Sequence, residues 1–334
     1  MKEITTVGLD LAKNLFQVHA VDENGAVLVR RQVRRAQVLL FFSRLHPCLI
    51  GIEACAGAHH WARELAKLGH DVRLIPPSYV NPFVKRGKTD AADAEAICEA
   101  VIRPNMRFVP LKTEKQQAVL MQHRTGDFLV RQLTQLANAI RAHLGEFGIV
   151  VPKGVHNMGR LIAEAETADL PPEARMPLDL LAGQFRDTKQ RIDVMTAQIK
   201  ADAEVDETAR RLQTMPGIGP ITASVLAATL PNVSSFRSAR DLPAWLGLTP
   251  KPHSSGGKER LGSISKMGNR YIRRLLSLGA MGVISARKLS EPSADWLGRL
   301  VATKPLKVAA IALANRMARA IWAMLKTGEA WRPA

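Results

Sequence analysis

The sequence predicts an α/β N-terminal part followed by a longer, mainly helical remainder. Three observations carry this prediction. Short strand-like apolar runs are confined to the first third of the chain, leucines three or four residues apart fill the middle, and helix-like segments separated by Pro-Gly and Gly-rich motifs fill the end. We therefore divide the 334 residues into parts 1–110, 111–208 and 209–334.

The first part contains five predicted strands and three helical stretches. The first strand ends in Asp10, and an apolar run typical of a buried strand ends in Glu53. Asn24-Gly25 is typical of a type I′ hairpin turn. The expected strands are 3–11, 15–21, 26–33, 48–53 and 71–76, and the helices are 35–45, 58–69 and 89–103. A three-stranded meander followed by alternating helix and strand is an α/β layout of the ribonuclease-H kind.

The second part carries no strand signal. Leu129, Leu133 and Leu136 begin one helical stripe, and an a/d pattern continues over 178–199. The two long helices are separated by a connector that contains Pro152 and Pro171. This pattern predicts a helical hairpin or coiled coil, either as an ordinary packing layer or as a coil that oligomerises.

The third part is expected to contain helices at 221–229, 239–246, 269–287 and 305–326. Before the first of them, Pro216-Gly217-Ile218-Gly219-Pro220 resembles the turn of helix-hairpin-helix modules. There Gly217 and Gly219 let the backbone approach a phosphate, and the helix N-terminus offers free N–H groups. The alternative is a tight turn between packed helices.

Charge indicates a polyanionic partner. The net charge is +17 and the pI about 10.3, which is typical of nucleic-acid binding. Residues 251–334 hold 16 Lys and Arg but 4 acids. No apolar run approaches the roughly 20 residues of a spanning helix, so we expect no membrane partner. The N-terminus has no signal-peptide pattern, and Cys48, Cys55 and Cys98 are interpreted as reduced core thiols in a cytoplasm.

Four carboxylates are candidate metal ligands. Asp10 and Glu53 end predicted strands, and their side chains meet at one sheet edge if those strands are adjacent and parallel. Asp90 and Asp93 share one face of a helix start. Oxygen ligands select Mg²⁺ or Mn²⁺, and two such ions clamp a phosphodiester for in-line displacement. Three of the acids also have a structural interpretation, Asp10 as a turn residue, Asp90 as an N-cap and Asp93 as a first-turn acid. Glu53 is harder to explain in this way, because acids next to a buried strand are rare unless they are paired.

Basic residues surround a polar loop in the third part. Ser254 and Ser255 precede Gly256-Gly257, and such a hydroxyl is either a nucleophile toward phosphate or only part of a loop. The basic side chains expected to contact nucleic-acid phosphates are Lys251, Lys258, Arg260, Lys266, Arg270, Arg273 and Arg274. Aromatic residues make up 5% of the chain, which argues against a base-stacking platform. Tyr79 and Tyr271 are weaker nucleophile candidates.

Together these blocks resemble a known family. Gly8-Leu9-Asp10-Leu11-Ala12-Lys13, Glu53 and Lys88-Thr89-Asp90-Ala91-Ala92-Asp93 look like the DEDD quartet of the insertion-sequence "one-ten" transposases. Met215-Pro216-Gly217-Ile218-Gly219, Trp245-Leu246-Gly247-Leu248-Thr249-Pro250, Ser255-Gly256-Gly257 and Ile264-Ser265-Lys266-Met267-Gly268-Asn269-Arg270 look like its C-terminal transposase domain. The match covers nearly the whole chain in the expected order, and some details favour the "eleven-eleven" branch.

The resemblance implies a RuvC-like domain that holds Mg²⁺ through Asp10, Glu53, Asp90 and Asp93, and a catalytic Ser255 with Ser254 as the register alternative. It also implies double-stranded DNA substrates, a noncoding guide RNA, and a homo-oligomer, dimer or tetramer, that acts in the cytoplasm at the nucleoid. Two other functions fit the residues. One is a junction resolvase or nuclease that uses water, and the other is a non-catalytic nucleic-acid-binding protein.

Overall fold

The structure is a computed structural model that describes residues 3–85, 87, 89–254, 257–258, 260–287 and 295–332. The chain divides into two compact units, Met1–Thr113 and Glu114–Ala334. The first unit is a mixed α/β structure and the second is mostly helical, as the sequence predicts. The predicted boundaries near residues 110 and 208 stay predictions.

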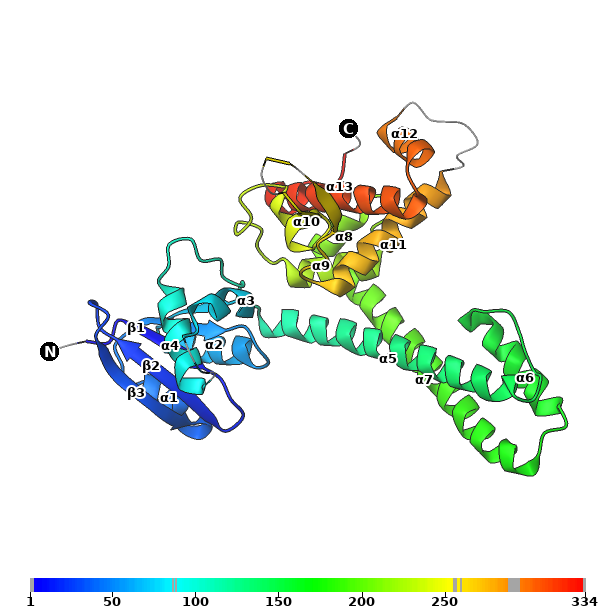
Figure 1. Ribbon diagram of the computed structural model, residues 1–334, viewed down its shortest axis with the longest axis horizontal. Helices are drawn as coiled ribbons and strands as arrows, with labels where there is room; N and C mark the ends of the chain where they lie inside the picture. Colours follow the sequence, from blue (N-terminus) through cyan, green and yellow to red (C-terminus); the bar gives the residue numbers. More distant parts are fainter. Residues whose placement is uncertain are drawn as a thin grey trace. The chain divides into compact units, whose positions relative to one another are not determined.

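A five-stranded mixed sheet forms the centre of the first unit (Figure 1). Its order is β3-β2-β1-β4-β5, with β1 antiparallel to β2 and parallel to β4. All five predicted strands are confirmed, with small shifts at their ends. The strands are β1 (Thr6–Asp10), β2 (Leu15–Val21), β3 (Val27–Arg34), β4 (Leu49–Glu53) and β5 (Asp71–Ile75).

The turn between β2 and β3 differs from the type I′ prediction. Gly25 has a φ of +80°, but Asn24 does not share the positive φ that a type I′ turn requires. Instead, the carboxylate of Asp22 accepts hydrogen bonds from the backbone N–H groups of Asn24 at 3.0 Å and Ala26 at 2.8 Å. The Asp22 side chain therefore makes the turn, as Asx residues do.

Helices cover both faces of the sheet. The predicted helix at 35–45 is a 3₁₀ turn, η1 (Arg35–Gln37), followed by α1 (Val38–Phe42). With α2 (Ala58–Lys67), α1 covers the face that carries Val7, Leu9 and Phe16. The other face is covered by α4 (Asp90–Val101), and short helices α3 (Pro77–Val80) and η2 (Asn81–Phe83) precede α4 in the chain.

Two glycines let α4 lie directly on the sheet. Gly8 in β1 pairs with Gly51 in β4. A Cβ atom at Gly8 would stand 2.0 Å from the carbonyl oxygen of Ala94 in α4, and one at Gly51 would stand 2.8 Å from Cβ of Val101. Any larger side chain at Gly8 would therefore push α4 away, so this pair fixes the distance between the helix and the sheet.

Two long helices open the second unit. α5 (Glu114–Gly145) and α7 (Pro172–Val205) pack against each other, with η3 (Val155–Asn157) and α6 (Met158–Thr167) in the connector (Figure 1). Many of their buried residues, among them Ile140, Leu144 and Phe185, belong to one apolar core that also includes α6. The predicted leucine stripe is thus used within the chain, and a further role in oligomerisation stays a prediction.

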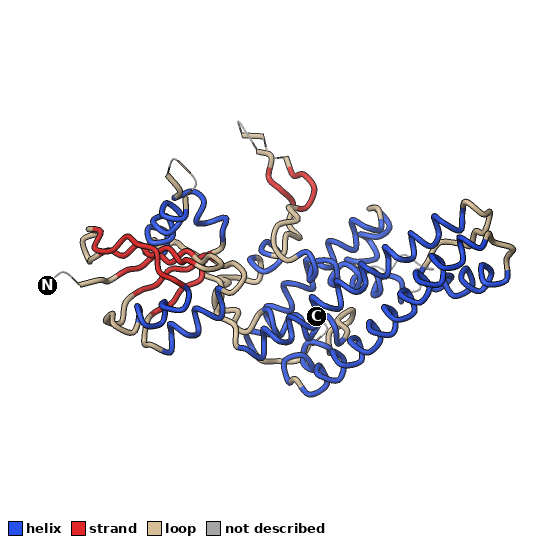
Figure 2. The backbone as a smooth tube through the Cα atoms, turned by 90° about the horizontal axis from the view of Figure 1, so that it is seen from below, coloured by secondary structure: helices blue, strands red, loops and turns tan. Residues whose placement is uncertain are grey.

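The rest of the second unit is a helical bundle with one small hairpin. The predicted helices are found as α9 (Pro220–Thr229), α10 (Asp241–Trp245), α11 (Arg270–Ala286) and α13 (Leu306–Thr327). α8 (Glu207–Gln213) and α12 (Trp296–Thr303) are additional. The hairpin of β6 (Pro250–Pro252) and β7 (Leu261–Ile264), which the sequence does not predict, projects from the helices (Figure 2).

Among the described residues, α13 is the helix long and apolar enough to cross a membrane, with a mean hydropathy of 1.3. Ala314, Ala318 and Ile321 on this helix are fully buried in the core that it shares with α11. Packing inside the bundle therefore accounts for one face of α13, and 39% of its apolar window is buried.

Candidate active site

Asp10 and Glu53 are the last residues of β1 and β4, which are adjacent and parallel as the site prediction requires. Their positions follow directly after the last pair of the register, Leu9 with Ile52. Side chains alternate along a strand, so Asp10 projects from the same face as Gly8, and Glu53 from the same face as Gly51. Both glycines face α4, so both carboxylates lie on the α4 side of the sheet edge.

Asp90 and Asp93 stand in the first turn of α4. This helix begins at Thr89, whose hydroxyl accepts a hydrogen bond from the backbone N–H of Ala92 at 3.2 Å. Thr89 is therefore the N-cap, and Asp90 is the first helical residue rather than the cap. Because α4 rests on Gly8, its first turn brings the two aspartates to the strand ends.

The electrostatics of Asp10 reflect this arrangement. Its pKa is raised from 3.8 to about 6, first by burial and then by the negative charges of Asp93, Asp90 and Glu53, while the backbone N–H of Leu11 lowers it. Three segments distant in sequence thus place like charges within range of one another. We call Asp10, Glu53, Asp90 and Asp93 the acidic cluster.

The acidic cluster supplies the hard oxygen ligands that divalent cations select. Among the described residues, however, no three Asp, Glu, His or Cys side chains stand close enough together to be ligands of one ion. The four carboxylates therefore act on one another electrostatically without forming a closed coordination shell, and their role as metal ligands stays a prediction. Mutual repulsion of carboxylates is the expected reason, since cations would have to offset it for the shell to close.

Cys55 corrects the prediction that all three cysteines are core thiols. Cys48 and Cys98 are buried, but Cys55 is exposed on the loop after β4. Burial and then the carboxylates of Glu53 and Asp10 raise the pKa of the Cys55 thiol. This thiol is therefore a neighbour of the acidic cluster and is kept in its neutral form.

The predicted serine loop is carried by the β6–β7 hairpin. Ser254 is exposed two residues after the end of β6, whereas Ser255 lies outside the described residues. The base of the hairpin is held by backbone hydrogen bonds from Ser265 to Thr249 (2.8 Å) and from Lys266 to Gly247 (3.2 Å). A Cβ at Gly268 would stand 1.9 Å from the carbonyl oxygen of Trp245. These motif residues thus anchor the loop to the bundle.

Most of the predicted phosphate-binding residues are exposed near this hairpin. Lys251 lies on β6, Arg260 directly precedes β7, Lys266 follows β7 and Arg270 begins α11. Lys258 is also exposed, within the hairpin loop. Within the described part of the chain, no ion pair or side-chain hydrogen bond holds these five side chains in place, and their contact with nucleic acid stays a prediction.

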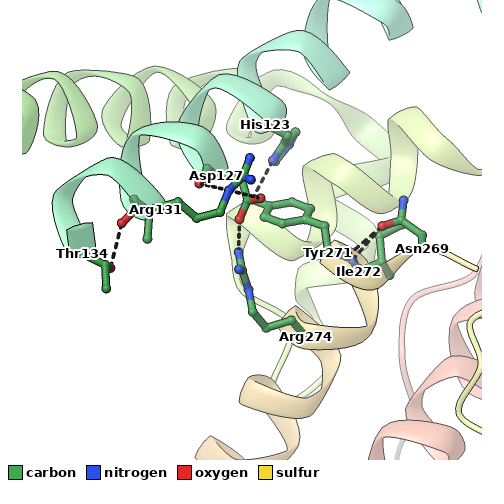
Figure 3. Close-up of polar contacts among 9 residues, drawn as sticks. His123, Asp127, Arg131, Thr134, Asn269, Tyr271, Ile272 and Arg274 are labelled. Atoms are coloured by element: carbon green, nitrogen blue, oxygen red, sulfur yellow. Dashed lines mark hydrogen bonds and ion pairs between the residues drawn. The ribbon is translucent and has the colours of Figure 1, made fainter. Parts of the chain in front are cut away.

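Arg273 and Arg274 have structural partners. Arg273 donates through Nη1 to the backbone carbonyl oxygens of Leu246 (2.9 Å) and Met267 (2.8 Å). Arg274 forms an ion pair with Asp127 of α5 at 2.6 Å, and its guanidinium lies over the ring of Tyr271 (Figure 3). Both arginines therefore have structural tasks, whether or not they also contact phosphates.

Tyr271 belongs to the same network. Its hydroxyl is 3.3 Å from Nδ1 of His123, and Nε2 of His123 is 3.1 Å from the hydroxyl of Ser224 (Figure 3 shows the first of these contacts). Burial raises the pKa of Tyr271 and lowers that of His123 to about 4. A buried phenol held between helices suits packing rather than attack on DNA.

The two glycines of the α8–α9 turn differ in their surroundings. Gly217 has a φ of +84°, and a Cβ there would stand 2.8 Å from the carbonyl oxygen of Gly279 in α11. Gly219 is the N-cap of α9, and a Cβ there would meet no atom within 4 Å. Close packing thus explains Gly217, while Gly219 keeps the open backbone that a phosphate contact needs.

Sequence reasoning missed Gly8 and Gly51 as the residues that position α4. The available signal was glycine within an otherwise apolar strand, which often marks a close approach of another backbone. Gly8 belongs to a motif that was interpreted only through Asp10, as a candidate metal ligand. The glycine pair matters because it lets α4, which carries Asp90 and Asp93, lie close to the strands that end in Asp10 and Glu53.

Comparison with known proteins identifies the family. Residues 7–149 match the model of a DEDD transposase domain of the IS110 type, and residues 209–294 match the Transposase IS116/IS110/IS902 family. The chain is 45% identical over 335 residues to a probable family 20 transposase of Pseudomonas aeruginosa, with 99% of each chain covered. The chain belongs to the IS110/IS116/IS902 family of insertion-sequence transposases.

Other relatives agree along the whole length. The transposase for IS1328 of Yersinia enterocolitica is 41% identical, with 98% of each chain covered. The transposase for IS1111A of Coxiella burnetii is 37% identical, with 99% of this chain and 92% of the relative covered. The matched DEDD domain contains all four acids of the cluster, and domains of this type in general use divalent metal ions. A non-catalytic function is therefore set aside.

Proposed function

We propose that this transposase cuts and rejoins DNA at a composite site, in which the acidic cluster holds Mg²⁺ or Mn²⁺ and Ser255 supplies the nucleophile. The observation that supports it most directly is the gathering of three carboxylates around Asp10, whose pKa is raised to about 6. A perturbed acid that shares one edge of a sheet with other carboxylates is typical of an active site. The N-terminal sheet order is compatible with a RuvC or ribonuclease-H-like nuclease domain.

The reaction would run in two steps that conserve bond energy. Bound cations would polarise the scissile phosphate and lower the cost of ionising the seryl hydroxyl. In the first step Ser255 loses its proton, its Oγ bonds to phosphorus, and the departing DNA oxygen takes up a proton to become a free hydroxyl. In the second step the hydroxyl of the partner strand attacks the phosphoserine, and the seryl oxygen regains a proton. No nucleotide cofactor is needed.

The partners follow from charge and from the family resemblance. The exposed cations on and beside the β6–β7 hairpin, such as Lys251 and Arg260, would hold the phosphates of double-stranded DNA and of a noncoding guide RNA. The α8–α9 turn would act as a helix-hairpin-helix-like contact through Gly219. The assembly would be a dimer or tetramer in which the acidic cluster and Ser255 come from different subunits, at work on the nucleoid in the cytoplasm. Target choice would come mainly from base pairing with the RNA.

A covalent-trapping experiment tests the proposal. The full chain is incubated with Mg²⁺, RNA transcribed from the noncoding end of its element, and labelled donor and target DNA, and the products are separated on a denaturing gel. We expect a protein–DNA adduct that disappears in Ser255→Ala and in Asp93→Asn. Ser254→Ala is the matched control, because it removes the neighbouring hydroxyl of the same loop.

Each other outcome has a defined meaning. An adduct lost in Ser254→Ala but kept in Ser255→Ala would move the nucleophile by one residue. Cleavage without an adduct, unchanged in Ser255→Ala, would show that water is the nucleophile and that the serine half of the proposal is wrong. Omission of the RNA should abolish target cutting, and cutting without it would remove the guide from the proposal.

A further inference from the structure

A cavity of about 280 Å³ lies at the same sheet edge as the acidic cluster. Its lining includes loop residues that directly follow β1 and the aromatic rings of Phe16 and Trp61 on the α2 side of the sheet. The lining residues that matter here are Leu11, Ala12, Lys13, Phe16, Arg35 and Trp61. The cavity thus combines an apolar floor with two cationic side chains.

The aromatic floor orients one of these cations. The guanidinium of Arg35 lies 5.1 Å from the centroid of the Trp61 ring and 5.8 Å from that of Phe16, and the two rings meet edge to face. Contact with ring faces uses none of the N–H donors of a guanidinium. Throughout the described ranges, neither Arg35 nor Lys13 forms an ion pair with a carboxylate. Their charge and donors remain available to an anion.

The cavity adjoins the acidic cluster through two short loops. Lys13 lies three residues after Asp10, and Cys55, which also lines the cavity, lies two residues after Glu53. The cavity and the acidic cluster therefore lie at the ends of the same two strands, β1 and β4, with the cavity toward α2 and the acids toward α4.

We propose that this cavity binds the sugar-phosphate of the nucleotide next to the scissile phosphodiester in the DNA strand that is cut, with Lys13 and Arg35 on its phosphate and the Phe16–Trp61 floor against its sugar. This inference rests on the proposed function, because it extends the substrate contact of the acidic cluster by one nucleotide. A strand held on both sides of the reacting phosphate is fixed in direction and position, which is how binding groups favour an in-line displacement.

The size and charge of the cavity favour this occupant. The cavity volume of about 280 Å³ is several times the roughly 30 Å³ that one water takes in the liquid, so the cavity has room for a phosphate together with a sugar. Four acids beside the cavity repel a free anion in solution. A phosphate that belongs to a bound DNA strand overcomes this repulsion, because the basic regions of the chain attract the rest of the strand.

The experiment measures the coupling between one DNA phosphate and Arg35. The full chain is titrated with labelled duplex from the end of its element, in Ca²⁺ in place of Mg²⁺, with a neutral methylphosphonate placed at one position at a time around the cleavage site. For the wild type we expect a loss of binding of about tenfold at one flanking position. Arg35→Ala should bind unmodified DNA about tenfold more weakly, with a salt slope smaller by about 1, and should be insensitive to that methylphosphonate.

Arg31→Ala is the matched control, because Arg31 is also an exposed arginine of the β3 region and lies over a ring, that of Phe41 at 5.1 Å, but outside the cavity. It should keep the wild-type sensitivity. Arg35→Lys, which keeps the charge, should be intermediate, and circular dichroism checks that each variant is folded. Equal sensitivity in Arg35→Ala and Arg31→Ala would overturn the inference. So would coupling of Arg35 to a methylphosphonate placed in the guide RNA instead of the DNA.

Binding and cleavage separate this inference from the proposed function. The same duplexes are assayed for cleavage in Mg²⁺ with wild type and Asp10→Asn. Coupling in binding without any Asp10-dependent cleavage would support the cavity contact and reject the proposed chemistry. Asp10-dependent cleavage with no coupling at Arg35 would support the chemistry and reject the cavity contact.

Discussion

Asp10 in the first unit and Asp127 in the second are both partly buried aspartates, and their surroundings are opposite. The charges that act on Asp10 are the carboxylates of Asp93, Asp90 and Glu53. Asp127 instead accepts the guanidinium of Arg274 at 2.6 Å and lies 3.6 Å from that of Arg131. One aspartate is held among like charges and the other is neutralised by opposite ones.

The difference distinguishes a site from a structural contact. Carboxylates gathered together oppose folding unless a cation binds, so a chain keeps such a group only where the cation has a task. The network around Asp127 ties α5 to α11, and its carboxylate is already neutralised by arginines. His123 in the second unit is a further example of a structural contact, because its neutral ring is buried and hydrogen-bonded to other side chains.

Asp10→Asn should give the largest effect. We expect cleavage of element-end DNA to fall by on the order of 10³-fold, because the acidic cluster loses a charge that holds the cations. In the absence of divalent metal, the same change should raise the free energy of unfolding by about 1 kcal/mol, since it removes repulsion at a partly exposed site. Strand-cleavage rates and urea titrations measure the two effects. A loss of stability in Asp10→Asn would contradict the interpretation that the carboxylates of the acidic cluster repel one another in the folded chain.

His123 should make the second unit sensitive to acid. Its pKa is lowered to about 4 in the folded chain, against 6.5 in the unfolded one. The unfolded state therefore binds more protons between these values, and stability present above 6.5 is lost as pH falls toward 4. The loss amounts to about 2 kcal/mol between about pH 7 and pH 5. Urea unfolding of wild type and His123→Gln over this range measures it, and parallel pH profiles would show that His123 is not responsible.

Divalent cations should stabilise the first unit but not the second. At Mg²⁺ concentrations about 100 times the dissociation constant, binding to the folded state alone adds about 2.7 kcal/mol. Thermal unfolding with Mg²⁺, compared with NaCl of equal ionic strength, measures this gain. It should vanish in Asp10→Asn and persist in Asp127→Asn. An equal gain in both variants would mean that the ion binds elsewhere.

Removal of the Asp127 carboxylate should have the smallest effect. Asp127→Asn leaves Arg274 without its partner, but the Arg274 side chain is 46% exposed and can turn to water. We therefore expect a loss of about 0.5 to 1 kcal/mol in urea unfolding and no change in DNA cleavage. In the double variant with Arg274→Gln the two losses should not add. A strong loss of cleavage would make the network part of the active site.

Local patterns predicted the first unit well. Period-two runs and turn residues placed all five strands, because four are short apolar runs and the more polar β3 follows a clear turn signal. The β6–β7 hairpin escaped prediction because Pro250 and Pro252 argue against a strand and its residues are mostly exposed. Helix α12 follows a stretch with no periodicity, and only Asp295 as its N-cap signals it.

Local sequence patterns also predicted part of the candidate site. The strand ends and the helix start identified the four acids. The positions of Asp10 and Glu53 at the ends of two parallel strands follow from the strand pairing alone, without knowledge of side-chain contacts. The cavity beside them joins Lys13, Arg35 and Trp61, which approach one another only in the folded sheet. The partners of Arg273 and Arg274 likewise come from distant segments, so sequence alone gave these arginines only their charge.

The close approach of α4 to Gly8 has a consequence for how related chains can diverge. A core position normally tolerates exchanges among apolar side chains, and each exchange moves the neighbouring helix a little. At Gly8 the backbone of α4 meets the backbone of the sheet, at the carbonyl of Ala94, so no side chain sets that separation. Substitutions elsewhere in this core can accumulate while the spacing between the first turn of α4 and the end of β1 stays the same. A single residue without a side chain thereby makes the geometry of the acids independent of most other changes around them.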